Sequence, residues 1–210
     1  GRSVCFNNEY PVILSTTYSI KETLSEGHIY DYLIIDEASQ VDLATGVLAF
    51  SCARNAIIVG DQHQLSNVLP PDDKRIADEI WNKYNFDECY HFATHNILTS
   101  VTELWNNIPS VLLREHYRCH PKIANFFNQK FYNGQLIVMT EDHGEPNVLS
   151  MYRTAPGNHA RNHMNQRQID VVQKEVLPAL KERGFCDIGI IAPYRDQVAA
   201  IKRQFGNAYE

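Results

Sequence analysis

Short apolar runs alternate along the chain with longer stretches in which apolar residues recur at helical spacing. The short runs predict strands at residues 11–16, 32–35, 56–59, 110–113, 148–152 and 187–191. The longer stretches predict helices at residues 45–52, 73–84, 98–106, 121–132, 166–183 and 197–205. Segments 142–147 and 155–165 are rich in Gly, Pro, Asn and His, and we expect loops there.

The strand patterns favour an α/β fold. The runs LIID and AIIVG are continuously apolar, which is typical of parallel strands covered by helices on both faces. A helical pattern ends at Pro109 and a new strand pattern begins beyond it. We therefore expect two parts, residues 1–108 and residues 109–210.

Composition narrows the class of protein. Hydrophobic residues make up 44% and charged residues 21%, and no apolar run approaches the roughly 18 residues that span a bilayer. Because no run is long enough, we expect no membrane partner. The five cysteines are scattered without a CxxC pair, so we expect a reducing, cytoplasmic compartment. The net charge of −6 argues against a general coat of nucleic acid, but it permits a local groove for one strand.

The strongest signal is YLIIDEASQ at residues 32–40, where an apolar strand ends in Asp36 and Glu37. Ligands of open α/β sheets bind at the carboxyl ends of the strands. Adjacent carboxylates there can divide the work, one holding Mg²⁺ and the other deprotonating an attacking water. An ordinary acidic turn is the alternative for a bare pair of this kind.

A second apolar strand ends in Gly60 and Asp61, within IIVGDQHQLSNV. The glycine permits an unusual turn, and Gln64 has an amide suited to a γ-phosphate or to the attacking water. Asp61 is equally suited to cap a helix.

Two further strings follow candidate strands. LLREHYRCHP contains Arg114 and Arg118, and an arginine is the usual device for neutralising a transferring phosphoryl group, although a surface ion pair is the commoner role. IIAPYRDQ leads into a loop that suits contact with a nucleic-acid strand or serves as a plain turn.

In their order and wording these strings resemble superfamily 1 helicases, in the branch of the RNA-surveillance helicases. DEASQ is similar to the family's Walker B motif, GDQHQL to its third motif, and YRCHP to its arginine-bearing motif. The upstream string ILSTTYS resembles the family's strand-contacting motif. The resemblance implies a RecA-like P-loop NTPase fold with two partial motor lobes, which use ATP and Mg²⁺ to move on single-stranded DNA or RNA.

The resemblance also implies roles for single residues. Asp36 would hold Mg²⁺, Glu37 would activate water, Gln64 would sense the γ-phosphate beside Gly60 and Asp61, and Arg118 would act as the arginine finger. Five further positions would contact nucleic acid: Thr16, Thr17, Pro193, Tyr194 and Gln197.

The chain departs from the family pattern, because no GxxxxGK[ST] phosphate loop occurs in it. We expect a piece of a longer motor, and we expect the 210-residue chain alone to hydrolyse little or no ATP. The alternative is a non-catalytic module of helicase shape that binds nucleic acid or a protein partner.

A zinc site is disfavoured despite the nine histidines. His159 and His163 have suitable i, i+4 spacing, but Ala160 stands where an HExxH site needs glutamate. His116, Cys119 and His120 fall within the arginine-bearing motif. The aromatic residues at 126, 127, 131 and 132 have helical spacing and are expected in the core.

Overall fold

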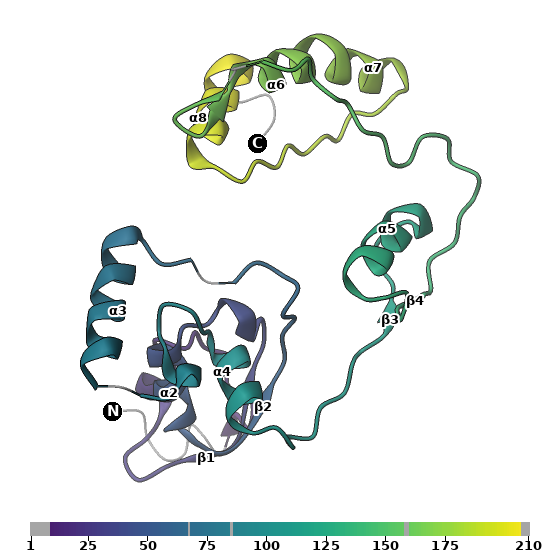
Figure 1. Cartoon of the computed structure of the whole chain (residues 1–210). Helices are drawn as coiled ribbons and strands as arrows, with labels where there is room; N and C mark the ends of the chain where they lie inside the picture. Colours follow the sequence, from purple (N-terminus) through teal and green to yellow (C-terminus); the bar gives the residue numbers. More distant parts are fainter. Residues whose placement is uncertain (1–8, 67, 85, 158–159, 207–210) are drawn as a thin grey trace. The chain divides into compact units, whose positions relative to one another are not determined.

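The computed structural model describes residues 9–66, 68–84, 86–157 and 160–206. The chain forms two compact units (Figure 1). The first comprises Gly1–Glu115 and Phe127–Ile137, and the second comprises His116–Phe126 and Val138–Glu210. The assignment of residues 1–108 and 109–210 to two motor lobes stays a prediction.

The elements before residue 115 all belong to the first unit. They are η1 (Ile20–Thr23), β1 (Tyr30–Ile35), η2 (Ala38–Gln40), α2 (Leu43–Phe50), β2 (Ala53–Ile58), α3 (Pro71–Tyr84), η3 (Glu88–Tyr90) and α4 (Ile97–Leu104). The later elements are β3 (Glu115–His116), α5 (Pro121–Phe131), β4 (Ile137–Val138), β5 (Ala160–Arg161), β6 (Met164–Asn165), α6 (Gln166–Val171), the π-helix η4 (Val172–Val176), α7 (Leu177–Glu182) and α8 (Arg195–Phe205).

A parallel pair of strands forms the centre of the first unit. β1 pairs with β2 in a register that places Tyr30 opposite Ala53 and Ile35 opposite Ile58. Parallel strands need a crossover, and α2 supplies it. Leu33 and Ile35 of β1 are buried in one core cluster with residues of α2 and α4, among them Ile97. This core fixes the ends of both strands.

Polar caps hold the two core helices. Asp42 accepts a hydrogen bond from Thr45 N at 2.9 Å, and Asn96 accepts one from Thr99 N at 3.0 Å. Thr99 Oγ1 in turn accepts from Asn96 N at 3.0 Å, which completes a capping box.

The predictions of the six helices and of strands 32–35 and 56–59 are confirmed, with ends that differ by a few residues. Strands predicted at 11–16, 110–113, 148–152 and 187–191 are wrong, because these segments pair with no strand among the described residues. Their apolar side chains are exposed or only partly buried, and Ile191 is fully accessible. The expectation that both sheet faces are buried is also wrong for β1, whose Tyr32 and Ile34 are exposed.

The second unit is built on helices. α6, η4 and α7 follow one another without a break, and Ile169 of α6 is 1% exposed. The wide π turn precedes Pro178, whose ring has no N–H to donate to the carbonyl four residues earlier.

The prediction of a loop across 155–165 is wrong for its second half. There β5 and β6 form a hairpin with a two-residue loop, in which Ala160 pairs with Asn165 and Arg161 with Met164. Its central residues, Asn162 and His163, have φ values of 48° and 58°, as a type I′ turn requires.

Candidate functional site

The ends of β1 and β2 bring two of the predicted motifs together. Asp36 and Glu37 directly follow β1, and Gly60 and Asp61 follow β2 after one intervening residue, Val59. Val59 N donates to Ile35 O at 2.8 Å, and Ala38 N donates to Val59 O at 2.9 Å. The parallel pairing therefore continues past the strands and places the two loops side by side at the carboxyl edge, where α/β proteins bind ligands.

The acidic pair is exposed at this edge. Asp36 Oδ1 accepts a hydrogen bond from Glu37 N at 2.9 Å. Glu37 has φ 51°, a left-handed conformation that is uncommon for a residue other than glycine. The residues that follow, Ala38 and Ser39, are buried, so the turn presents both carboxylates to solvent while its base is packed.

Gly60 is required by the close approach of the two loops. A Cβ atom at this position would lie 3.0 Å from Leu98 Cδ2 and 3.2 Å from the backbone nitrogens of Ala38 and Ser39. Backbone atoms cannot move aside without displacing the acidic turn. The glycine therefore sets the spacing between the loops.

Replacing Gly60 by alanine is expected to lower the free energy of unfolding by about 1 to 3 kcal/mol, the usual effect of overpacking. Urea denaturation of the 210-residue chain measures it. Gly189→Ala is the matched control, because a Cβ there meets nothing within 4 Å and the φ is ordinary. Equal effects of the two substitutions would contradict the assigned contact.

Asp61 organises the loop after β2. Its Oδ1 accepts from His63 N at 2.9 Å, and its Oδ2 accepts from Gln64 Nε2 at 3.3 Å. These hydrogen bonds close a turn. Asp61 therefore does not cap a helix, since the next helix, α3, begins only at Pro71. Gln64 is exposed on this turn, and Gln62 Nε2 bonds Thr102 Oγ1 of α4 at 3.2 Å.

Tyr132, just after α5, is a site residue that the sequence pattern missed. Its hydroxyl donates to Asp61 Oδ2, and its ring meets that of His63 edge-on at 5.4 Å between centroids. The expectation of a common aromatic core is wrong for Phe126 and Phe131, which are half exposed. The contact joins residues 71 apart, so no local pattern signals it.

The hydrogen bond between Tyr132 and Asp61 shifts both acidities. Burial raises the pKa of Asp61, but hydrogen bonds from Tyr132, the His63 backbone and Gln64 outweigh it and hold this pKa below its ordinary 3.8. Burial, reinforced by the Asp61 carboxylate, raises the pKa of Tyr132 from 10.0 to about 12. The pair therefore stays a neutral donor and a charged acceptor across the physiological range.

Tyr132→Phe is expected to lower the free energy of unfolding by about 1 to 2 kcal/mol near neutral pH. The raised tyrosine pKa stabilises the fold fully below pH 10, and this contribution is lost as the pH rises toward 12. The lowered aspartate pKa stabilises above 3.8 and is lost at lower pH. Urea titrations of both proteins from neutral to alkaline pH test this: the difference in stability must shrink above pH 10, and a constant difference would contradict it.

Arg118 lies in the second unit, between β3 and α5. It is exposed, and it makes no hydrogen bond or ion pair with the residues that the structure describes. The flanking histidines are engaged in the fold: His116 Nε2 accepts from Cys119 N at 2.9 Å, and His120 Nδ1 accepts from Lys122 N at 3.1 Å. The guanidinium is therefore available to a ligand, while the motif around it is structured.

The second unit contains one group of side chains that could hold a metal ion among the described residues. Its ligand atoms, from His120, Asp142 and Glu145, lie within 4.8 Å of one another. His120 Nε2 lies 3.2 Å from Glu145 Oε2, and Lys122 Nζ lies 3.2 Å from Asp142 Oδ2. Since Nδ1 of His120 accepts a backbone hydrogen bond, its Nε2 carries the proton in the neutral ring and donates to Glu145 Oε2. Lys122 and this imidazole satisfy the acids without a metal ion.

The five predicted nucleic-acid contacts occupy different surroundings. Thr16 is exposed in a turn before η1 and Thr17 is partly buried, whereas Pro193 and Tyr194 are exposed before α8. Gln197 is 7% exposed, and its side chain binds the backbone of Asn165. Its amide is therefore committed within the fold, and contact of all five with nucleic acid stays a prediction.

Two general features complete the description. No helix among the described residues is both long enough and apolar enough to cross a bilayer. Cys52, Cys89, Cys119 and Cys186 are free thiols, while Cys5 and His159 lie outside the described residues.

The chain is similar to known helicases and to two families of protein domains. A family described as "AAA domain" matches residues 95–210, and a second family with the same description matches residues 5–69. The uncharacterized ATP-dependent helicase MG140 homolog of Mycoplasma pneumoniae is 30% identical over 157 residues, which cover 72% of this chain and 14% of that protein. Helicase sen1 of Schizosaccharomyces pombe is 26% identical over 86% of this chain and 11% of its own length. The DNA replication ATP-dependent helicase/nuclease DNA2 of Gallus gallus is 24% identical over 92% of this chain and 18% of its own length.

The chain thus spans less than a fifth of these relatives, and the first AAA-domain match covers more than half of the chain. The match at residues 5–69 contains DEASQ and GDQHQL, and the match at residues 95–210 contains the arginine-bearing motif at residues 117–121. The fold is accordingly that of the P-loop NTPases. The chain belongs to the AAA-domain family of superfamily 1 helicases.

Proposed function

We propose that this chain supplies the water-activating and charge-neutralising half of an ATPase site in a helicase motor with RecA-like lobes. The observation that carries the proposal is the pair of strand ends that presents Asp36 and Glu37 beside Gly60 and Asp61. The function of the helicase relatives supports ATP as the substrate and a nucleic-acid strand as the track. The free cysteines support a reducing, intracellular compartment.

The acidic turn fits a hydrated divalent cation. Its carboxylates are exposed, and oxygen ligands that leave several waters in place suit Mg²⁺. Asp36 would hold the ion, which when bound neutralises charge on the β- and γ-phosphates. Glu37 is then free to activate the attacking water molecule.

In the proposed reaction Glu37 accepts a proton from a water molecule as the water oxygen attacks the γ-phosphorus. The bond between that phosphorus and the bridging oxygen breaks, and the electron pair leaves with ADP. Gln64 orients the water or the γ-phosphate through its amide, and Arg118 stabilises the charge that develops on the phosphoryl oxygens. The products are ADP and inorganic phosphate.

Asp36→Asn in the full-length gene product tests the metal assignment. The substitution keeps the shape and removes the charge, so the Mg²⁺ concentration for half-maximal ATP hydrolysis is expected to rise on the order of 10- to 100-fold. Asp31→Asn, on the exposed surface of β1, is the matched control. An unchanged Mg²⁺ dependence in the Asp36 variant would remove this residue from the metal site.

A further inference from the structure

The loop after β2 is held to the rest of the first unit at separate points. Gln62 Nε2 bonds Thr102 Oγ1 of α4 at 3.2 Å. The ring of Tyr132, from a later segment of the same unit, packs edge-on against the ring of His63. The backbone of the loop is therefore held in place independently of its charged side chain, Asp61.

The Asp61 carboxylate accepts hydrogen bonds from three donors. Its Oδ1 accepts from His63 N, and its Oδ2 accepts from both Gln64 Nε2 and the Tyr132 hydroxyl. His63 and Gln64 belong to the same turn as Asp61. In the described part of the chain, Tyr132 is thus the one donor that reaches this carboxylate from outside the turn. Burial and the bond to Asp61 raise the pKa of Tyr132 to about 12, so its hydroxyl keeps its proton wherever ATP hydrolysis is assayed.

The carboxylate in turn orients the exposed amide of Gln64. An ionised carboxylate only accepts, so the amide nitrogen faces Asp61, at 3.3 Å from Oδ2, and the amide oxygen Oε1 faces a different direction. This oxygen makes no hydrogen bond with the residues that the structure describes. A water molecule can donate to it, whereas a charged phosphate oxygen, itself an acceptor, cannot. The free oxygen therefore suits the attacking water.

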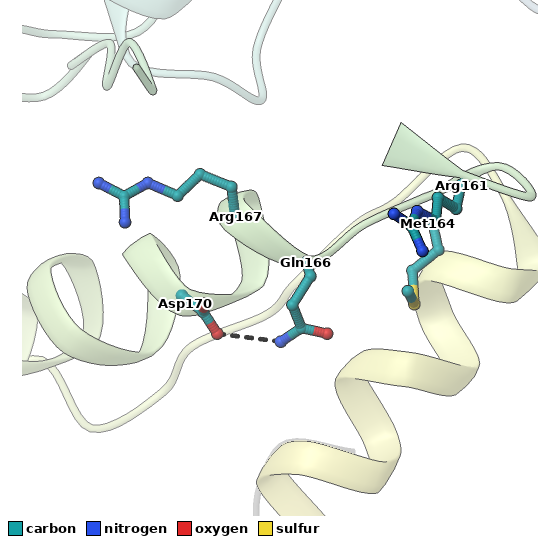
Figure 2. A pocket seen from close by; sticks show the side chains of 5 residues that line it. All are labelled: Arg161, Met164, Gln166, Arg167 and Asp170. Atoms are coloured by element: carbon teal, nitrogen blue, oxygen red, sulfur yellow. Dashed lines mark hydrogen bonds between the residues drawn. The ribbon is translucent and has the colours of Figure 1, made fainter. Parts of the chain in front are cut away.

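A glutamine–aspartate pair in the second unit lacks these features (Figure 2). Gln166 Nε2 donates to Asp170 Oδ1 at 2.9 Å on the wall of an open pocket of about 440 Å³. Among the described residues Asp170 accepts from amides alone, those of Gln166 and Gln204. The side chains of Arg161 and Arg167 point apart in Figure 2, so these charges do not converge on a ligand. The pair supplies a control of the same chemistry outside the candidate site.

We propose that Tyr132 is a positioning residue for ATP hydrolysis, acting through Asp61 to hold the Gln64 amide oxygen toward the attacking water; this inference rests on the proposed ATPase function. The water donates one proton in a hydrogen bond to Gln64 Oε1, and Glu37 accepts the other. The tyrosine hydroxyl itself touches neither the water nor the nucleotide. Its loss leaves the Gln64 amide free to rotate, so a productive alignment becomes rarer while ATP binding is unchanged.

Two measurements on the full-length gene product test this role, steady-state ATP hydrolysis and binding of a fluorescent ATP analogue. Tyr132→Phe removes only the hydroxyl and keeps the ring against His63, so kcat is expected to fall about 10- to 100-fold while the affinity stays within about twofold. Tyr90→Phe is the matched control and should retain the full rate, because this exposed hydroxyl makes no hydrogen bond with the described residues. A lower affinity with unchanged kcat would overturn the inference, since it would indicate that Gln64 contacts the γ-phosphate.

A double-mutant cycle separates positioning from a general loss of stability. If Tyr132 acts through Gln64, Gln64→Ala alone lowers kcat, and adding Tyr132→Phe lowers it further by no more than about twofold. Asp42→Ala removes the cap of α2 and is expected to destabilise the first unit to a comparable extent, yet it should keep the full rate while the protein is folded. Gln166→Ala, which removes the amide of the control pair, should also keep the full rate.

The outcomes distinguish this inference from the proposed function. Losses that multiply in the double variant, or a kcat of Tyr132→Phe within about twofold of the unsubstituted protein, would overturn the positioning role. Hydrolysis that requires Glu37 but not Tyr132 overturns that role alone. Absence of hydrolysis from folded, unsubstituted protein overturns the proposed function and the positioning role together.

Discussion

Replacing Arg118 by alanine in the full-length gene product is expected to lower kcat for ATP hydrolysis by about 10³- to 10⁵-fold, the effect of losing an arginine finger. The guanidinium is exposed and unengaged within the described residues, so its removal breaks no contact of the fold. The loss should therefore appear in the chemical step and leave thermal stability nearly unchanged. Steady-state release of phosphate at saturating ATP measures it.

Two further variants test this role: Arg118→Lys is the conservative substitution, and Arg153→Ala is the control. Lysine keeps the charge but not the planar, bidentate geometry, so it should restore only part of the rate. Arg153 is exposed in the same unit and belongs to no predicted motif, so its alanine variant should retain full activity. A kcat in Arg118→Ala equal to that of Arg153→Ala would contradict the assigned role.

Glu37→Gln is expected to lower kcat by about 10²- to 10⁴-fold, the usual contribution of a general base. Glutamine preserves the size of the side chain and can still hold a water, but it cannot accept a proton. Binding of Mg²⁺ and ATP should persist, because Asp36 is unchanged. A fluorescent ATP analogue reports binding, and phosphate release reports the chemistry.

Glu26→Gln removes an exposed carboxylate of the same unit outside the candidate site, and it should retain the full rate. The informative pattern is nucleotide binding without turnover in the Glu37 variant alone. Turnover that survives Glu37→Gln would assign the base elsewhere. Binding and turnover lost together would instead indicate damage to the turn, whose left-handed backbone at Glu37 is already strained.

The sequence predicted helices more reliably than strands for a physical reason. A helix satisfies its own backbone hydrogen bonds, so amphipathic spacing and caps such as Asn96 nearly suffice to locate α4. A strand needs a neighbour. The apolar segments 110–113 and 187–191 have strand composition but no pairing partner among the described residues, and their apolar side chains are exposed or only partly buried.

The candidate site was predictable where chemistry follows directly from position along the chain. An acidic pair and a Gly-Asp pair were each predicted directly after an apolar strand, and the structure brings the two loops together. Contacts between distant segments were not predictable. The Tyr132 hydroxyl donates a hydrogen bond to Asp61, 71 residues away along the chain, and the side-chain amide of Gln197 is hydrogen-bonded to the backbone of Asn165. The hairpin at Asn162 and His163 was missed because its turn lacks the usual glycine.

The most direct test of the proposed motor function is ATP hydrolysis by the full-length gene product, with single-stranded DNA and single-stranded RNA titrated separately. A helicase motor is expected to show Mg²⁺-dependent hydrolysis that one or both strands stimulate, and the stronger stimulator identifies the track. Folded protein that hydrolyses no ATP with either strand would contradict the motor assignment and leave a non-catalytic binding module.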